Sequence, residues 1–248
     1  MLRNISRRAL LLATWPIRYS VRQELRKQTA LLHQDIGTAL QRRATESTAR
    51  YVEARMRGID SVCSNLELLA MALKSAELDQ QKLLCEFGVY SGRTINHIAS
   101  LTEHPVYGFD SFEGLPERWR DGFGKGRFSV TSLPRVRPNV VLIKGWFDKA
   151  LPLFAKEHSG PIGFLHIDCD LYSSTKTIFD VLGHRIHPGC VIVFDEYFNF
   201  PGWEDGEYRA FQEFIMSARL AYEYVGYNRL HEQVAVKIKG GNQFHGAA

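Results

Sequence analysis

Five short apolar runs along the chain share one pattern, because each ends in an acidic or glycine-containing cluster. The runs cover residues 82–88, 106–110, 139–145, 162–168 and 190–196. Their length and composition are typical of strands buried on both faces. Helix-like stretches follow most of them, and this alternation predicts a parallel sheet in an α/β domain.

The ends of these runs are expected to meet in space. Ligands of open parallel sheets bind at the carboxyl ends of the strands. The residues at these ends are Glu86, Asp110, Gly145, Asp168, Asp195 and Glu196. A crevice with this many carboxylates suits hydroxyl groups, cationic ligands or a hard metal ion.

The segments between the runs predict the rest of the domain. We expect helices over about 60–78, 88–102, 147–157, 171–185 and 205–219. Residues 111–138 form a long connection rich in Gly and Pro, as functional lids often do. Residues 221–228 and 232–239 predict a hairpin that adds one antiparallel strand. The expected sheet therefore has seven strands and is mostly parallel.

The first 57 residues differ from the rest of the chain. Residues 20–57 are polar, with a loose apolar stripe at helical spacing. We therefore expect a helical extension over 1–57 that serves as a lid, a dimer arm or a membrane-surface segment. Residues 58–248 would form the catalytic domain. A dimer arm would make the protein a homo-oligomer.

The charge is divided unevenly along the chain. Residues 1–60 hold 12 Lys and Arg against 5 Asp and Glu, a balance of +7, and residues 61–248 hold 19 against 22, a balance of −3. The body therefore lacks the basic excess of a nucleic-acid-binding domain, and we expect no nucleic-acid partner. The four cysteines form no C-x-x-C pair. They are expected to be reduced, mostly buried thiols in a cytoplasmic protein.

Residues 1–23 leave two interpretations open. The apolar run Ala9–Ile17 is too short to span a bilayer. A basic amphipathic helix could lie on a membrane surface, which would make the protein peripheral to the membrane. Alternatively, a surface helix would pack Leu10, Leu11, Leu12 and Trp15 against a neighbouring element.

Two motifs indicate a nucleoside-containing ligand. The stretch Glu86–Gly92 is a strand end that turns into a helix, where glycines allow close backbone approach to a ligand. It is no dinucleotide fingerprint, because Tyr90 stands where the middle glycine would be. Asp110 lies 22 residues after Gly88. An acid at about that separation can accept hydrogen bonds from both hydroxyls of a ribose. A plain tight turn with a capping aspartate would also explain these residues.

A third motif gathers acids from two strand ends, His166-Ile167-Asp168-Cys169-Asp170 and Asp195-Glu196. Oxygen ligands without cysteine or paired histidines favour Mg²⁺, Mn²⁺ or Ca²⁺ over zinc. The alternative is an acidic rim paired with Arg or Lys side chains.

Five blocks of sequence carry a family resemblance: EFGVYSGRTINHIA, VYGFDSFEGLPERW, LIKGWFDKALP, LHIDCDLYSSTKTIFDVL and GCVIVFDEYFNFPG. They resemble the macrocin O-methyltransferase family, the sugar O-methyltransferases of macrolide and aminocoumarin biosynthesis, over roughly residues 80–215. The resemblance implies the class I methyltransferase (Rossmann-like) fold, S-adenosylmethionine as cofactor and dependence on Mg²⁺. It does not extend to residues 1–57.

The resemblance also implies roles for single residues. Asp168, Asp195 and Glu196 would hold the metal, and the family pattern has a second aspartate in place of Glu196. Asp168 would double as general base, with His166 as the candidate if no metal is used. The cofactor would be held by Glu86, Gly88, Tyr90, Ser91, Gly92, Asp110, Ser111, Phe112, Gly145 and Trp146.

The acceptor would be a small molecule with a reactive hydroxyl. A sugar hydroxyl of a glycoside natural product or saccharide is expected. A phenol or catechol is the alternative, because vicinal hydroxyls on an aromatic ring present the same geometry to a metal. A non-catalytic, membrane-associated protein that keeps the cofactor-binding fold is a third interpretation, disfavoured by the intact acids.

Overall fold

A computed structural model describes residues 14–241, apart from the side chains of residues 28 and 30–33. Its centre is one eight-stranded sheet in the order β1-β7-β8-β6-β5-β2-β3-β4. The strands are β1 (Ser61–Val62), β2 (Leu83–Phe87), β3 (Val106–Asp110), β4 (Val140–Lys144), β5 (Ile162–Ile167), β6 (Ile186–Phe194), β7 (Ala221–Asn228) and β8 (Val234–Lys239).

The directions of the strands confirm the predicted topology. Strands β2 to β6 are parallel to one another, and β8 runs antiparallel to both β6 and β7. The predicted count of seven strands is wrong by one, because β1 pairs with β7 through Ser61 and Val62 alone. A strand of two residues is too short to show an alternation of apolar and polar positions in the sequence. The helix predicted from residue 60 instead begins at Asn65, where the Ser64 side chain caps it.

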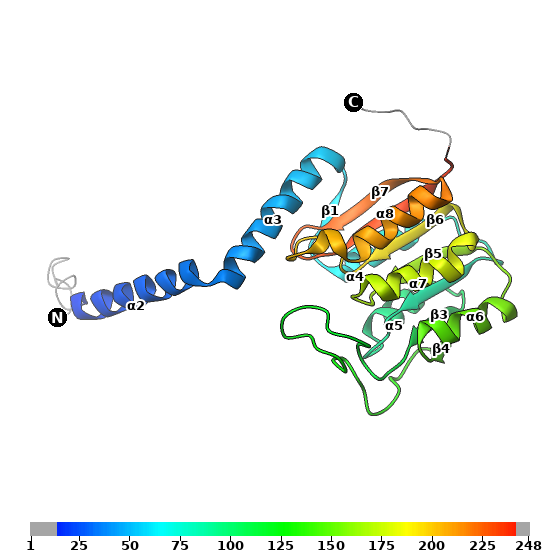
Figure 1. Ribbon diagram of the computed structural model, residues 1–248, viewed down its shortest axis with the longest axis horizontal. Coiled ribbons are helices and arrows are strands. Elements are labelled where there is room, and N and C mark those ends of the chain that lie inside the picture. The colour runs from blue at the N-terminus through cyan, green and yellow to red at the C-terminus, as the bar shows by residue number, and fades with distance from the viewer. Residues whose placement is uncertain (1–13, 242–248) are drawn as a thin grey trace, which may run out of the picture.

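Helices cover both faces of the sheet (Figure 1). The cluster of buried residues on one face includes α4 (Asn65–Ser75) and α5 (Arg93–Ser100). The cluster on the other includes α6 (Phe147–Glu157), α7 (Tyr172–Leu182) and α8 (Glu207–Ala218). Helix α8 buries Ala210, Phe211, Phe214 and Ile215, the three-to-four spacing of a helix with one apolar face. Short 3₁₀ turns lie at η1 (Gly183–Arg185) and η2 (Trp203–Asp205).

The N-terminal segment forms two helices, α2 (Trp15–Gln34) and α3 (Ile36–Arg55), which extend away from the body (Figure 1). Asp35 separates them, because its side chain caps α3 by accepting from the N–H groups of Gly37 and Thr38. The far end of α3 packs onto the body, and Ala44 and Met56 belong to its main core. The division at residue 57 stays a prediction.

Two expectations for residues 1–23 can be compared with the structure only in part. Leu10, Leu11 and Leu12 lie outside the described residues. Trp15 is 62% exposed and stacks on Tyr19 of its own helix, with ring centroids 5.3 Å apart. Among residues 14–241, no helix combines the length and apolar character needed to cross a bilayer.

Candidate active site

A cavity of about 530 Å³ opens where the parallel strands end. It spans the ends of β2, β3, β4, β5 and β6, as the strand-end pattern predicts. The predicted site residues that line it are Gly88, Tyr90, Asp110, Ser111, Gly145, Trp146, Asp168, Asp195 and Glu196. Part of the 111–138 connection closes one side, with Trp119, Arg120, Phe123 and Phe128 on the cavity wall.

Five predicted site residues do not line this cavity: Glu86, Ser91, Gly92, Phe112 and His166. Glu86 and His166 are fully buried, because they sit within β2 and β5 and face each other across the sheet. Gly92 is the N-cap of α5, and Phe112 belongs to the core beside α5. Direct contact of these five with a cofactor stays a prediction.

The turn after β2 depends on Gly88. Its backbone has φ +94°, and a Cβ placed there would lie 1.6 Å from the carbonyl oxygen of Asp168. No larger residue fits without moving the end of β5. The two strand ends are also joined by a hydrogen bond from Asp168 N to Phe87 O of 2.8 Å. The glycine is therefore required by the close packing of this turn on the end of β5, and the same turn also lines the cavity.

Asp110 organises the entrance to α5. Its Oδ2 accepts from the N–H groups of Val89 (2.9 Å) and Tyr90 (2.8 Å), and its Oδ1 accepts from Phe112 N (2.6 Å). An ionised carboxylate can accept about four hydrogen bonds, so Asp110 keeps capacity for a ligand hydroxyl. It thus fixes the glycine turn and can contact a ligand within the cavity.

A metal-competent cluster joins β5 and β6. One ligand atom each from His166, Asp168 and Asp195 lies within 4.8 Å of the others. Among buried side-chain atoms of the described chain, His166 Nε2, Asp195 Oδ1 and Glu196 Oε2 have no hydrogen-bond partner. Carboxylate oxygens with one imidazole suit a hard divalent cation, so the residues fit such an ion. Glu196 is not part of this group of three, and its role as a ligand stays a prediction.

A buried polar chain runs beneath the cluster. Thr94 Oγ1 donates to Glu86 Oε1 (3.0 Å), and Glu86 Oε2 lies 2.9 Å from His166 Nδ1. His166 Nε2 lies 3.7 Å from Asp195 Oδ1. Burial opposes a charge on His166, but the carboxylates of Asp195 and Glu86 outweigh it and raise its pKa well above the usual range. His166 is thus held as a bridge between the two acids.

Crowding of carboxylates shifts their proton affinities. Burial, together with the nearby Asp195, raises the pKa of Asp168 well above its ordinary value. Burial raises the pKa of Asp170 to about 7, although the guanidinium of Arg120 opposes the shift. Burial also opposes ionisation of Asp195, yet the His166 ring, 3.7 Å from Asp195 Oδ1, holds the pKa of Asp195 below the ordinary value. Asp168 is therefore the more basic of the two cluster carboxylates.

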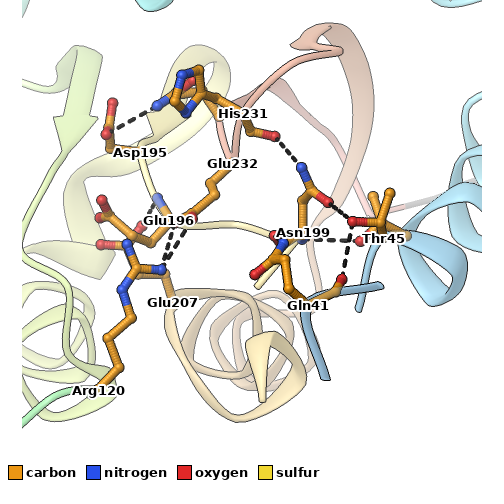
Figure 2. A network of polar contacts seen from close by, with 11 residues as sticks. Gln41, Thr45, Arg120, Asp195, Glu196, Asn199, Glu207, His231 and Glu232 are labelled. Atoms are coloured by element: carbon orange, nitrogen blue, oxygen red, sulfur yellow. Dashed lines mark hydrogen bonds and ion pairs between the residues drawn. The ribbon is translucent and has the colours of Figure 1, made fainter. Parts of the chain in front are cut away.

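Several site residues escaped sequence reasoning. Arg120 Nη1 donates to both carboxylate oxygens of Glu232, at 3.0 and 3.1 Å, and the Arg120 guanidinium lies 3.7 Å from the Trp119 ring centroid. Figure 2 shows this pair beside Glu196 and the buried Glu207. The pair connects the 111–138 segment to the β7–β8 loop. No local motif marks it, because its members are 112 residues apart.

Asn199 connects α3 to the loops around the site (Figure 2). Thr45 Oγ1 donates to its side-chain oxygen (2.9 Å), and its side-chain nitrogen donates to the carbonyl of His231 (3.2 Å). Its backbone N–H donates to Thr48 Oγ1 (2.9 Å), and its carbonyl accepts from Gln41 Nε2 (2.7 Å). The loop that follows Asp195 and Glu196 is thereby anchored to the N-terminal helices.

Comparison with known proteins shows which sequences the chain resembles. Residues 85–197 match a family model described as a methyltransferase domain. The 8-demethyl-8-(2,3-dimethoxy-alpha-L-rhamnosyl)-tetracenomycin-C 4'-O-methyltransferase of Streptomyces olivaceus is 29% identical over 46% of this chain and 52% of its own length. The demethyldecarbamoylnovobiocin O-methyltransferase of Streptomyces niveus is 28% identical over 51% of this chain and 58% of its own length. The chain spans about half the length of these curated relatives.

Solved structures show the same fold. The calicheamicin methyltransferase CalS11 superposes with a TM-score of 0.54 at 21% identity, covering 69% of this chain and 76% of that one. The O-methyltransferase NovP gives a TM-score of 0.53 at 20% identity, covering 69% and 78%. The predicted class I methyltransferase fold is confirmed, and so is the resemblance to sugar O-methyltransferases.

Proposed function

Because the chain carries a methyltransferase domain of the class I fold, we propose that it is a Mg²⁺-dependent S-adenosylmethionine O-methyltransferase. Its acceptor would be a hydroxyl of a small molecule, a sugar hydroxyl before others. One observation carries the proposal: a single cavity contains both the Gly88–Asp110 turn and the carboxylates Asp168 and Asp195. A cofactor and an acceptor bound there would share one enclosed space.

The cofactor side of the proposal rests on the backbone. Gly88 lines the cavity, and Asp110 keeps acceptor capacity for a ribose hydroxyl. Gly145 and Trp146 line the same cavity at the end of β4. Bound S-adenosylmethionine would supply an electrophilic methyl group. The protein's main task is then to align an acceptor oxygen with it.

The acceptor side rests on the carboxylates. A divalent ion held by Asp168 and Asp195, with Glu196 as the further predicted ligand, would lower the pKa of a hydroxyl bound to it. Asp168 lines the cavity, so its carboxylate can accept a proton from a hydroxyl bound there. His166 does not line the cavity, and its ring nitrogens face Glu86 and Asp195. We therefore propose Asp168 as the general base.

Aromatic side chains on the cavity wall bear on the choice between a sugar and a phenol as acceptor. Tyr90, Trp119, Phe123, Phe128 and Trp146 line the cavity. Aromatic faces can pack against the apolar face of a sugar ring or stack on a phenol. The relatives whose names specify rhamnosyl-tetracenomycin and demethyldecarbamoylnovobiocin support a glycosylated natural product. The aromatic wall is the observation that keeps a phenolic acceptor as the second candidate.

The test uses the full chain with S-adenosylhomocysteine and Mg²⁺. Calorimetry should detect binding of the demethylated cofactor, and turnover with a panel of glycosides and catechols should stop in EDTA and return with Mg²⁺. Asp195→Asn should weaken cation binding and leave cofactor binding largely intact. Absence of cofactor binding at millimolar ligand by folded protein would reject the proposal. Full turnover in EDTA would reject its metal-dependent part and favour a metal-free base such as His166.

A further inference from the structure

Glu207 is a fully buried carboxylate that does not line the cavity. It is the first residue of α8. Burying a carboxylate is costly unless hydrogen bonds or opposite charges compensate it. The position at the positive end of a helix dipole supplies part of that compensation. Two backbone N–H groups supply a further part.

Each oxygen of Glu207 accepts from a different loop. Cys169 N donates to Oε1 (3.4 Å), and Glu196 N donates to Oε2 (3.2 Å; Figure 2). The first N–H belongs to the peptide unit that joins Asp168 to Cys169. The second belongs to the peptide unit that joins Asp195 to Glu196. One side chain therefore holds the two peptide units directly after the cluster carboxylates.

We propose that Glu207 is a positioning residue that sets the separation of Asp168 and Asp195 and so the affinity of the site for a divalent cation. The inference rests on the proposed function, because it assumes that these carboxylates hold a cation. The two loops leave different strands, and a carboxylate can accept from both at once. An amide cannot, because it has one acceptor oxygen and its NH₂ group would face the second N–H.

The experiment titrates the full chain with Mn²⁺ and follows the free ion by electron paramagnetic resonance. We expect Glu207→Gln to weaken Mn²⁺ binding by about 10–100-fold, the range for residues that orient metal ligands. Affinity for S-adenosylhomocysteine, measured by calorimetry, should change little, because Asp110 lies on β3 and its hydrogen bonds go to Val89, Tyr90 and Phe112 rather than to the two peptide units that Glu207 holds. Glu213→Gln is the matched control, since Glu213 lies on the same helix but is partly exposed and pairs with Arg209 and Tyr172. It should bind Mn²⁺ as the wild type does.

The outcomes separate this inference from the proposed function. Equal Mn²⁺ affinity in Glu207→Gln and wild type would overturn the role of Glu207 alone. Parallel loss of Mn²⁺ and cofactor binding would also overturn it, because general disruption would then explain both. If the wild type binds cofactor but no Mn²⁺, both the role of Glu207 and the cation site of the proposed function are rejected. If Glu207→Gln does not fold, Glu207→Asp replaces it, because the shorter side chain keeps the charge but cannot reach both N–H groups; unchanged Mn²⁺ affinity there would overturn the inference.

Discussion

At Asn199, replacement by glycine should destabilise the protein less than replacement by alanine, which is the reverse of the usual order within a helix. The backbone of Asn199 is left-handed, with φ +65°. Asparagine tolerates this conformation, glycine adopts it freely, and alanine does not. Its side chain also bonds to Thr45 of α3 and to His231 in the β7–β8 loop. Replacement by Ala and replacement by Gly both remove these two side-chain hydrogen bonds. The two variants differ in backbone strain, because only glycine adopts the left-handed conformation freely.

The magnitudes follow from these contacts. Both hydrogen bonds are exposed, so each contributes about 0.5 kcal/mol, the low end of the usual range. Alanine pays a further ~1–2 kcal/mol for the left-handed backbone, which gives a total loss of about 2–3 kcal/mol. Glycine avoids that strain but gains about 0.4–1 kcal/mol of unfolded-state entropy, for a total loss of about 1.5–2 kcal/mol. Asn199→Gly should therefore be the more stable variant, by about 0.8 kcal/mol at the midpoints of these ranges and by about 1.6 kcal/mol at most.

Urea unfolding at equilibrium measures the free energies of wild type, Asn199→Ala and Asn199→Gly. Ala49→Gly is the control, because Ala49 lies exposed within α3, where glycine should cost about 1 kcal/mol. An Asn199→Ala protein as stable as Asn199→Gly, or more so, would refute the argument from backbone strain. If both variants were as stable as the wild type, the two side-chain hydrogen bonds of Asn199 would contribute nothing to stability.

The remaining predictions concern the cofactor, the acids and the N-terminal helix. Asp110→Ala should weaken binding of S-adenosylhomocysteine by about 1.5–3 kcal/mol in calorimetry, since it removes a charged acceptor; unchanged affinity would exclude the ribose role. Because the pKa of Asp170 is raised from 3.8 to about 7, its contribution to stability is full below pH 3.8 and is lost as the pH rises through 7. The urea-unfolding free energy of wild type relative to Asp170→Asn should thus fall over that interval, and a constant difference would contradict it. A chain starting at Glu24 should keep the melting temperature of the full chain, because residues 15–23 are exposed; a drop of many degrees would show that they pack on the body.

The parts of the site that sequence predicted are those with local signals. Gly88, Asp110, Asp168 and Asp195 each follow directly on an apolar run, and parallel strands bring such ends together. The same rule placed Glu86 at the crevice, which is not where its side chain lies. The alternation along a strand shows which residues share a face, but it does not show which of their side chains are covered by neighbouring elements. Thr94 and His166 satisfy Glu86 inside the protein.

The parts that sequence missed depend on partners far along the chain. Glu207 contacts Cys169 across 38 residues, and Thr45 contacts Asn199 across 154. Neither side chain has an unusual neighbour in sequence, so their roles emerge only once helices and loops are packed. The extra strand β1 was missed for the opposite reason, because two residues are too few to display any periodicity.

The contact between Gly88 and the Asp168 carbonyl has a consequence for engineering. Substitutions at position 88 should mostly distort the site, because any side chain there pushes on the end of β5, directly before Asp168. If the proposed function holds, new acceptor selectivity is better sought on the part of the cavity wall formed by residues 111–138. Trp119, Phe123 and Phe128 reach the cavity from a surface segment, so libraries at these three positions can reshape it while the strand ends stay in place.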